Sequence, residues 1–218
     1  PEIGWDLTVN KLEILNNQIA FNNQNFPKTT KEGIDFQHLT VRELILILKD
    51  FEWKGKSINV EIDRLGLIEK SGFTLQNLKG KLRADTTQIV IENLAIQTPY
   101  SRLGNTTKLQ FKQFADLADI TNNVTFKSDF DNLNIGFNDL KLFAPVINEI
   151  KQLNTNLKER VFLDGQIGGT VNNLNIQNLD FKIGQDVALL LSGKLKNITT
   201  IDEATFDIDL KKLATSYQ

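Results

Sequence analysis

Several residue types that carry chemistry are rare or absent in this chain of 218 residues. It has no cysteine, which excludes disulfides and thiolate metal sites. Its one histidine, His38, excludes a histidine-rich metal cluster and leaves a histidine-based catalytic relay without support. We interpret His38 as a surface or structural residue. The longest apolar run, residues 41–48, is interrupted by Arg42 and Glu43 and is too short to span a bilayer.

The charged residues are nearly balanced in sign. The 25 basic and 27 acidic residues give a formal net charge of -2. They are interleaved along the chain, so no basic stripe of the kind that tracks nucleic-acid phosphates emerges. No glycine-rich phosphate loop precedes a predicted helix. We therefore expect a non-enzymatic protein with no cofactor, no bound metal and no nucleic-acid partner.

Alternation of apolar and polar residues is the dominant pattern. It is clear in residues 5–10, 58–63, 133–137 and 206–210. Successive side chains of a β-strand point to opposite faces, so each stretch has one apolar and one polar face. Turns rich in asparagine and glycine separate about fifteen such runs, a density typical of all-β proteins. Proline, which removes a ladder donor, occurs only four times.

This pattern predicts a mostly β fold: a long, curled antiparallel sheet, or β-groove, with one or two short helices. A sheet of this length cannot hide an apolar face without curling or acquiring a second layer. If it curls, its inner face is a trough in which each buried methylene of an acyl chain gains roughly 0.8 kcal/mol. A sandwich filled by side chains is the alternative.

The candidate groove-lining residues are apolar and, with few exceptions, stand in alternating runs. They are Leu7, Val9, Ile58, Val60, Ile62, Ile89, Ile91, Ile96, Leu109, Phe111, Val124, Phe126, Leu133, Ile135, Phe137, Ile176, Phe181, Ile183, Leu189, Leu191, Phe206, Ile208 and Leu210. We expect these side chains to share one face of the sheet.

One helix is predicted from Asp139 to Arg160, and a weaker candidate lies at residues 111–120. The apolar residues of the first recur at three- and four-residue steps and form one stripe on an otherwise polar helix. They are Phe143, Ile147, Ile150, Leu153 and Leu157. This helix either packs on a core or forms a lid on the groove. It divides the chain into a groove segment (1–138), the amphipathic helix (139–160) and a continuing groove segment (161–218).

Short motifs recur without a fixed period. Residues 78–82, Leu-Lys-Gly-Lys-Leu, return as Leu-Ser-Gly-Lys-Leu at residues 191–195. Asn-Leu pairs recur where strands are expected to start. These pairs are Asn77-Leu78, Asn93-Leu94, Asn132-Leu133, Asn173-Leu174 and Asn178-Leu179. The lack of a strict period predicts an open meander in which each strand pairs with its sequence neighbour.

Several segments follow one another in a specific order. They are residues 139–145 (DLKLFAP), 161–174 (VFLDGQIGGTVNNL), 190–195 (LLSGKL) and 204–208 (ATFDI). This order resembles the TamB family, inner-membrane components of the bacterial translocation and assembly module within the AsmA-like group. Residues 34–39 (IDFQHL), 69–73 (EKSGF) and 94–101 (LAIQTPYS) resemble its Bacteroidetes versions in particular.

The resemblance implies a protein of the periplasm, anchored to the inner membrane by a segment not present here, that conducts phospholipids toward the outer membrane. It implies phospholipid as a partner, and an outer-membrane β-barrel of the Omp85 type contacted through regions outside this segment. Because the family's anchor and C-terminal region have no counterpart here, we expect a fragment of a longer chain. The alternative is a scaffold for outer-membrane protein assembly, whose exposed sheet edges receive barrel strands.

Overall fold

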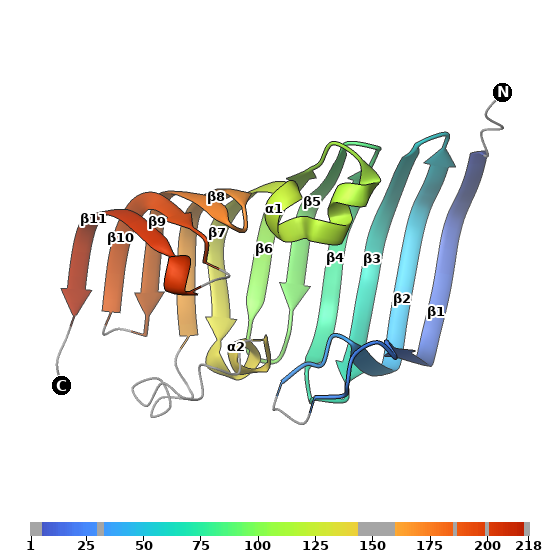
Figure 1. Cartoon of the computed structure of the whole chain (residues 1–218). Coiled ribbons are helices and arrows are strands. Elements are labelled where there is room, and N and C mark those ends of the chain that lie inside the picture. Colours follow the sequence, from blue (N-terminus) through green and yellow to red (C-terminus); the bar gives the residue numbers. More distant parts are fainter. Residues whose placement is uncertain (1–5, 30–32, 144–159, 185–186, 199–200, 216–218) are drawn as a thin grey trace.

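One antiparallel sheet of eleven strands makes up most of the molecule (Figure 1). The computed structural model describes residues 6–29, 33–143, 160–184, 187–198 and 201–215. Each strand pairs with its neighbours in sequence, so the sheet is a meander from β1 at one edge to β11 at the other. The strands are β1 (Asp6–Asn22), β2 (His38–Lys54), β3 (Ser57–Glu69), β4 (Thr74–Ala84), β5 (Gln88–Gln97), β6 (Arg102–Gln110), β7 (Thr125–Gly136), β8 (Arg160–Thr170), β9 (Asn173–Ile183), β10 (Val187–Lys196) and β11 (Thr205–Thr215). The predicted fold class, a mostly β, curled antiparallel sheet, is confirmed.

The strands are fewer and longer than the sequence pattern indicated. The prediction of about fifteen strands is wrong, because the described residues form eleven. Three pairs of the glycine-containing kind that the sequence pattern assigns to turns lie inside strands: Lys79-Gly80 in β4, Gly104-Asn105 in β6 and Gly168-Gly169 in β8. A glycine within a strand permits a bulge or the close approach of a neighbouring backbone, so it need not end the strand.

Bulges divide the longer strands into two alternating runs and keep both runs on one face. The apolar positions step by three instead of two between Ile62 and Leu65 in β3 and between Ile91 and Leu94 in β5, and the pairing register shifts at both places. A β-bulge adds one residue to its strand, so alternation resumes toward the same face. The same step occurs at Leu75–Leu78 of β4, Phe130–Leu133 of β7, Ile176–Leu179 of β9 and Leu210–Leu213 of β11.

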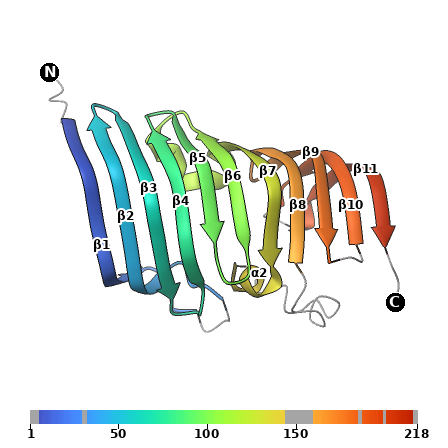
Figure 2. The same ribbon diagram turned by 180° about the vertical axis from the view of Figure 1, so that it is seen from behind.

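Four of the five Asn-Leu pairs mark these bulges. Asn77, Asn93, Asn132 and Asn178 each precede the leucine at which alternation resumes. Asn93 and Asn178 have φ angles of 53° and 47°, the left-handed conformation in which asparagine is enriched. Their interpretation as strand starts is therefore wrong, and only Asn173-Leu174 opens a strand. Because bulges bend strands and increase their twist, they also contribute to the curvature of the sheet (Figures 1 and 2).

Short helices lie near the strand ends on one side of the sheet (Figures 1 and 2). The β6–β7 connection contains η1 (Phe114–Asp119) and α1 (Ile120–Asn123), α2 (Phe137–Phe143) follows β7, and η3 (Ile201–Glu203) precedes β11. Of the helix predicted at residues 139–160, residues 139–143 lie in α2, residues 144–159 lie outside the described residues, and Arg160 begins β8. The weaker candidate at residues 111–120 overlaps η1 and the first residue of α1.

The molecule has little dry core. Its accessible surface is 14385 Å², whereas a compact monomer of 24.7 kDa exposes about 10,100 Å². Several of the buried apolar side chains lie where helices meet the sheet, with Phe111 and Val124 flanking the η1–α1 connection and Phe137 opening α2. The sheet therefore keeps much of its apolar surface accessible.

Candidate functional site: the apolar face of the sheet

One row of side chains shows how the two faces of the sheet are separated. Register pairs connect one residue from each strand across the whole sheet. From β1 to β11 these residues are Leu7, Trp53, Ile58, Ala84, Ile89, Leu109, Phe126, Gly169, Leu174, Leu195 and Phe206. Directly paired residues project from the same face, so this row is free of polar side chains from one edge to the other. With strands about 4.8 Å apart, the row is about 48 Å long.

The neighbouring row projects from the opposite face and is polar. It consists of Thr8, Glu52, Asn59, Arg83, Val90, Lys108, Lys127, Gly168, Asn175, Lys194 and Asp207. Val90 is its one large apolar side chain. Since the two rows are one residue apart in every strand, the sheet has one apolar and one polar face over its full width.

The pairing register brings the predicted lining residues of the strands together on the apolar face. Phe111, Val124 and Phe137 lie just beyond strand ends and are buried. In the central strands the predicted lining residues are mostly half-buried. At the edges they are exposed, with Leu7 of β1 at 49% and Phe206 of β11 at 67% of full exposure. The apolar surface therefore reaches from edge to edge along the row from Leu7 to Phe206 and is most open to solvent at the two edge strands.

A polar spot interrupts the apolar face at β6 and β7. Thr107 of β6 and Ser128 of β7 are a register pair, and their hydroxyl oxygens lie 3.0 Å apart. The Thr107 hydroxyl also donates to Oδ1 of Asn105 at 3.1 Å. Ser128 is buried. Sequence reasoning missed this spot because residues 105–108 and 127–129 are polar in both phases of the alternation. The signal was available in Leu103 and Leu109, which place residues 105 and 107 on their own face.

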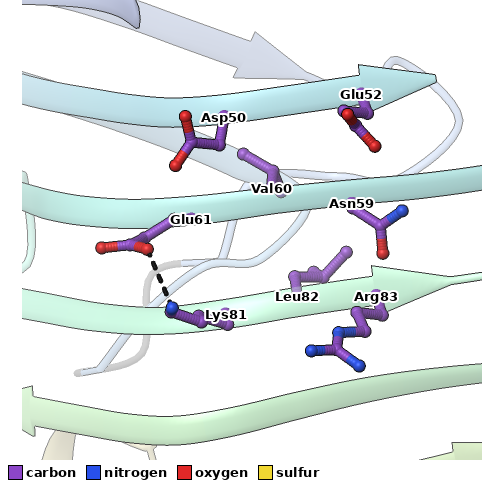
Figure 3. Close-up of a pocket in the computed structure, with 8 residues that line it drawn as sticks. All are labelled: Asp50, Glu52, Asn59, Val60, Glu61, Lys81, Leu82 and Arg83. Carbon is purple, nitrogen blue, oxygen red and sulfur yellow. Dashed lines mark ion pairs between the residues drawn. The ribbon is translucent and has the colours of Figure 1, made fainter. Parts of the chain in front are cut away.

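Ion pairs connect neighbouring strands on the polar face. Oε2 of Glu61 lies 3.2 Å from Nζ of Lys81 (Figure 3), and Oδ2 of Asp63 lies 3.0 Å from Nζ of Lys49. The hydrogen bond to Lys49 lowers the pKa of Asp63, and the same bond raises the pKa of Lys49. A shallow depression over β2–β4 is lined mainly by charged and polar side chains (Figure 3). The polar face is thus suited to contact with water.

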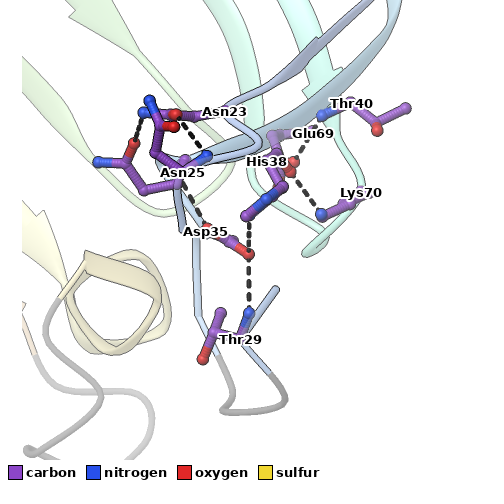
Figure 4. Close-up of polar contacts among 9 residues, drawn as sticks. Asn23, Asn25, Thr29, Asp35, His38, Thr40, Glu69 and Lys70 are labelled. Atoms are coloured by element: carbon purple, nitrogen blue, oxygen red, sulfur yellow. Dashed lines mark hydrogen bonds and ion pairs between the residues drawn. The ribbon is translucent and has the colours of Figure 1, made fainter. Parts of the chain in front are cut away.

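Buried carboxylates hold the end of the sheet at which β1, β3, β5 and β7 terminate. We call this end the α2 rim; it comprises residues 23–29, 33–37, 70–73, 98–101 and α2, with the adjoining strand ends. Asp35 accepts hydrogen bonds from the backbone N–H groups of Thr29 at 3.0 Å and Gln37 at 3.1 Å (Figure 4). Its Oδ2 lies 3.1 Å from Nδ1 of His38. Burial raises the pKa of Asp35, but these hydrogen bonds outweigh it and the pKa is lowered. His38 is buried and has a structural role here.

Glu69 makes a second connection at the α2 rim. It is 3% exposed and accepts hydrogen bonds from the backbone N–H groups of Thr40 at 3.2 Å (Figure 4) and Ser71 at 2.7 Å. Burial raises its pKa, but the hydrogen bonds from Ser71, Thr40 and Lys70 outweigh this and lower the pKa. Glu69 thereby fixes the β3–β4 turn to the start of β2.

Asp139 anchors α2. It is 5% exposed and accepts hydrogen bonds from the hydroxyl groups of Thr98 and Ser101 in the β5–β6 turn. The backbone N–H of Gly136 donates to the Ser101 hydroxyl oxygen at 3.0 Å. These contacts hold the first turn of α2 against the sheet.

Phe143 joins the last turn of α2 to two other parts of the rim. Its ring centre lies 5.1 Å from that of Phe73 in the β3–β4 turn and 6.3 Å from that of Phe36 in the β1–β2 connection. The backbone N–H of Ile34 donates to the carbonyl of Leu142 at 2.9 Å. Phe143 is thus the one predicted lid residue that the structure describes. The others, Ile147, Ile150, Leu153 and Leu157, lie outside the described residues.

Comparisons with known proteins do not place the chain in a family. No family model, no curated protein and no solved structure matches it. Within the residues that the structure describes, no helix has the length and apolar character needed to cross a membrane. Those same residues contain no cluster of three or more His, Cys, Asp or Glu side chains that could hold a metal ion.

Proposed function

We propose that the apolar face binds the acyl chains of phospholipids and lets them move from strand to strand across the sheet. The observation that carries the proposal is the row from Leu7 to Phe206, which crosses all eleven strands without a polar side chain. An accessible apolar surface of this extent is unusual for a soluble monomer and marks a binding surface. An acyl chain laid on it gains roughly 0.8 kcal/mol for each methylene removed from water.

In this proposal the sheet is one section of a passive conduit. It lies in the bacterial periplasm and carries phospholipids toward the outer membrane, with anchorage and the β-barrel partner supplied by regions outside this segment. The resemblance to the TamB family supports this setting. The face itself has no feature that drives transport in one direction, so direction is supplied elsewhere.

Charged substitutions on the apolar face test the proposal. Val60→Asp, Ile135→Asp and Ile208→Asp should each lower the amount of phospholipid that copurifies with the protein severalfold, as measured by native mass spectrometry. Circular dichroism and the urea unfolding midpoint should stay close to those of the unmodified protein. Asn59→Asp places the same charge on the polar face beside Val60 and should leave the lipid content unchanged.

If the apolar face is instead a dry packing core, the same substitutions should unfold the protein. If the unmodified protein carries no phospholipid and Val60→Asp unfolds the sheet, the apolar face is an internal packing surface and the proposal fails.

The open edges of the sheet favour a second candidate function, that of a scaffold for barrel strands. The outer edges of β1 and β11 have no paired strand among the described residues, and β11 is exposed along its whole length. Such an edge can accept an added strand through backbone hydrogen bonds. N–H groups of successive residues point alternately toward β10 and toward the open edge. Of the two substitutions Ile208→Pro and Asp209→Pro, one therefore removes an N–H at the open edge and the other an N–H that faces β10. If the scaffold function holds, the proline at the open edge abolishes binding of a barrel-strand peptide and spares lipid content.

A further inference from the structure

The two rims of the sheet differ in the side chains that they expose. At the α2 rim, four aromatic side chains in connections or at the end of α2 are about half exposed: Phe26 (52%), Phe36 (57%), Tyr100 (47%) and Phe143 (50%). The opposite end, which we call the α1 rim, comprises the connections at residues 55–56, 85–87, 111–124, 171–172, 197–198 and 201–204. Of the side chains described there, none is an exposed large hydrophobic residue.

Charge at the α2 rim is sorted by burial. Of the residues described there, the acidic side chains Asp35, Glu69 and Asp139 are buried and accept hydrogen bonds from N–H and O–H groups of the rim itself. Four of its basic side chains, Lys28, Lys70, Arg102 and Arg160, are exposed.

The contacts that the structure shows for these basic side chains do not neutralise their charge, because the acceptors are uncharged. Lys70 donates to the backbone carbonyl of His38, and Nη1 of Arg160 donates to Oδ1 of Asn134 at 3.3 Å. Both acceptors are neutral. The α1 rim, in contrast, is mixed in charge: Lys56 and Lys112 are exposed beside the acidic residues Asp119, Asp202 and Glu203. The α2 rim therefore combines exposed aromatic rings with exposed basic side chains while its described acidic side chains are buried, whereas the connections of the α1 rim expose charge of both signs and no large hydrophobic side chain among the residues described there.

We infer that the α2 rim docks on the surface of a membrane that contains anionic phospholipids. Aromatic rings favour the boundary between headgroups and acyl chains, and each lysine or arginine near an anionic bilayer adds attraction. The bonds of Asp139 and the ring contacts of Phe143 with Phe36 and Phe73 hold this part of the rim in place, so the Phe36 and Phe143 rings need little ordering on binding. This inference rests on the rim alone and stands whether or not the apolar face carries lipid.

Vesicle flotation tests the inference. The protein should float with vesicles of phosphatidylcholine and phosphatidylglycerol, and poorly with phosphatidylcholine alone. Neutralising Lys28→Gln and Arg102→Gln should weaken binding about fivefold for each residue, and Phe26→Ser should weaken it further. The matched control, Lys54→Gln with Lys112→Gln near the α1 rim, should bind as the unmodified protein does. Circular dichroism verifies that each variant is folded.

A fluorescence measurement reports insertion directly. Phe26→Trp is introduced into a Trp5→Phe, Trp53→Phe background, and its emission should shift to the blue and be quenched by brominated lipids. A residue at the α1 rim, Thr86→Trp in the same background, should show neither change.

Three results would overturn the inference. One is equal loss of binding in the α1-rim control, and another is unchanged flotation of the Lys28, Arg102 and Phe26 variants. The third is full competition by soluble glycerol phosphate, which would reduce the site to one for isolated phosphate groups. Native mass spectrometry on the same variants keeps the two ideas apart: lipid content should not change when vesicle binding is lost. If the protein docks through this rim but never carries lipid, the proposed conduit function fails and the docking inference stands.

Discussion

The two faces of the sheet belong to the same strands, one residue apart, yet they are stabilised in different ways. On the polar face, pairs such as Glu61–Lys81 and Lys49–Asp63 link strands through exposed side chains, and exposed ion pairs contribute little. On the apolar face, side chains share one surface only because bulges correct the phase of each long strand. The apolar surface therefore depends on the phase of the alternation in each strand more than on any single contact.

Two adjacent glycines give the sharpest contrast between the faces. Gly169 belongs to the apolar row and has φ +114°, and a Cβ there would lie 2.1 Å from the carbonyl oxygen of Asn173. Gly168 belongs to the polar row, and a Cβ there would lie 3.2 Å from the carbonyl oxygen of Phe126. Gly169→Ala should destabilise the protein by about 3 kcal/mol or more, since it combines backbone strain with a clash. Gly168→Ala should change stability by less than about 1 kcal/mol. Urea unfolding measures both, and equal effects would refute the contrast.

Two aspartates compare a buried carboxylate with a partly exposed one. Asp139→Ala leaves the hydroxyls of Thr98 and Ser101 without their charged acceptor, and should cost about 2 kcal/mol. It should also free α2, which hydrogen exchange of residues 137–143 would detect. Asp63→Ala removes only a partly exposed partner of Lys49 and should leave the unfolding midpoint nearly unchanged. A larger loss in Asp63→Ala than in Asp139→Ala would contradict this ranking.

The class of fold and the residues of the apolar face follow from alternation alone. Ile58, Val60 and Ile62 alternate with polar residues, and a strand with that pattern must place them on one face. The meander also follows where a short turn separates two runs, as at residues 55–56 between β2 and β3 and at residues 171–172 between β8 and β9. What alternation could not supply is continuity across a bulge. Ile91 and Leu94 are three residues apart, which breaks strict alternation, so the sequence pattern divides this single strand into two.

The rims could not be predicted from local pattern. Asp139 meets Thr98 and Ser101 from 41 and 38 positions away in sequence, and a polar residue at the start of a helix has many local roles. The burial of Asp35, Glu69 and Asp139 depends on how three connections fold over one end of the sheet. No periodicity encodes that arrangement, so the basic and aromatic surface of the α2 rim emerges only from the structure.

The polar spot at Thr107 and Ser128 tests how far the apolar face tolerates hydroxyl groups. The double variant Thr107→Val, Ser128→Ala removes both partners of a hydrogen bond, so stability should change by less than about 1 kcal/mol. If acyl chains cross this spot, the double variant should carry as much phospholipid as the unmodified protein or more, in contrast to Val60→Asp. Native mass spectrometry gives the comparison. A loss of lipid would mean that the hydroxyls contact the lipid themselves.

The smallest effect concerns the pH dependence of the Lys49–Asp63 pair. The hydrogen bond lowers the pKa of Asp63 below 3.8, so its stabilising contribution is complete above that pH and is lost as the pH falls through the folded-state pKa. The same bond raises the pKa of Lys49 above 10.5, so the contribution is complete below that pH and is lost as the pH rises through the folded-state value. The difference in unfolding midpoint between the unmodified protein and Asp63→Asn should therefore be flat at neutral pH and vanish at both extremes. It should also shrink in about 1 M NaCl, where the Debye length is about 3 Å. A difference that persists in strong acid would show that Asp63 acts through packing and not through its charge.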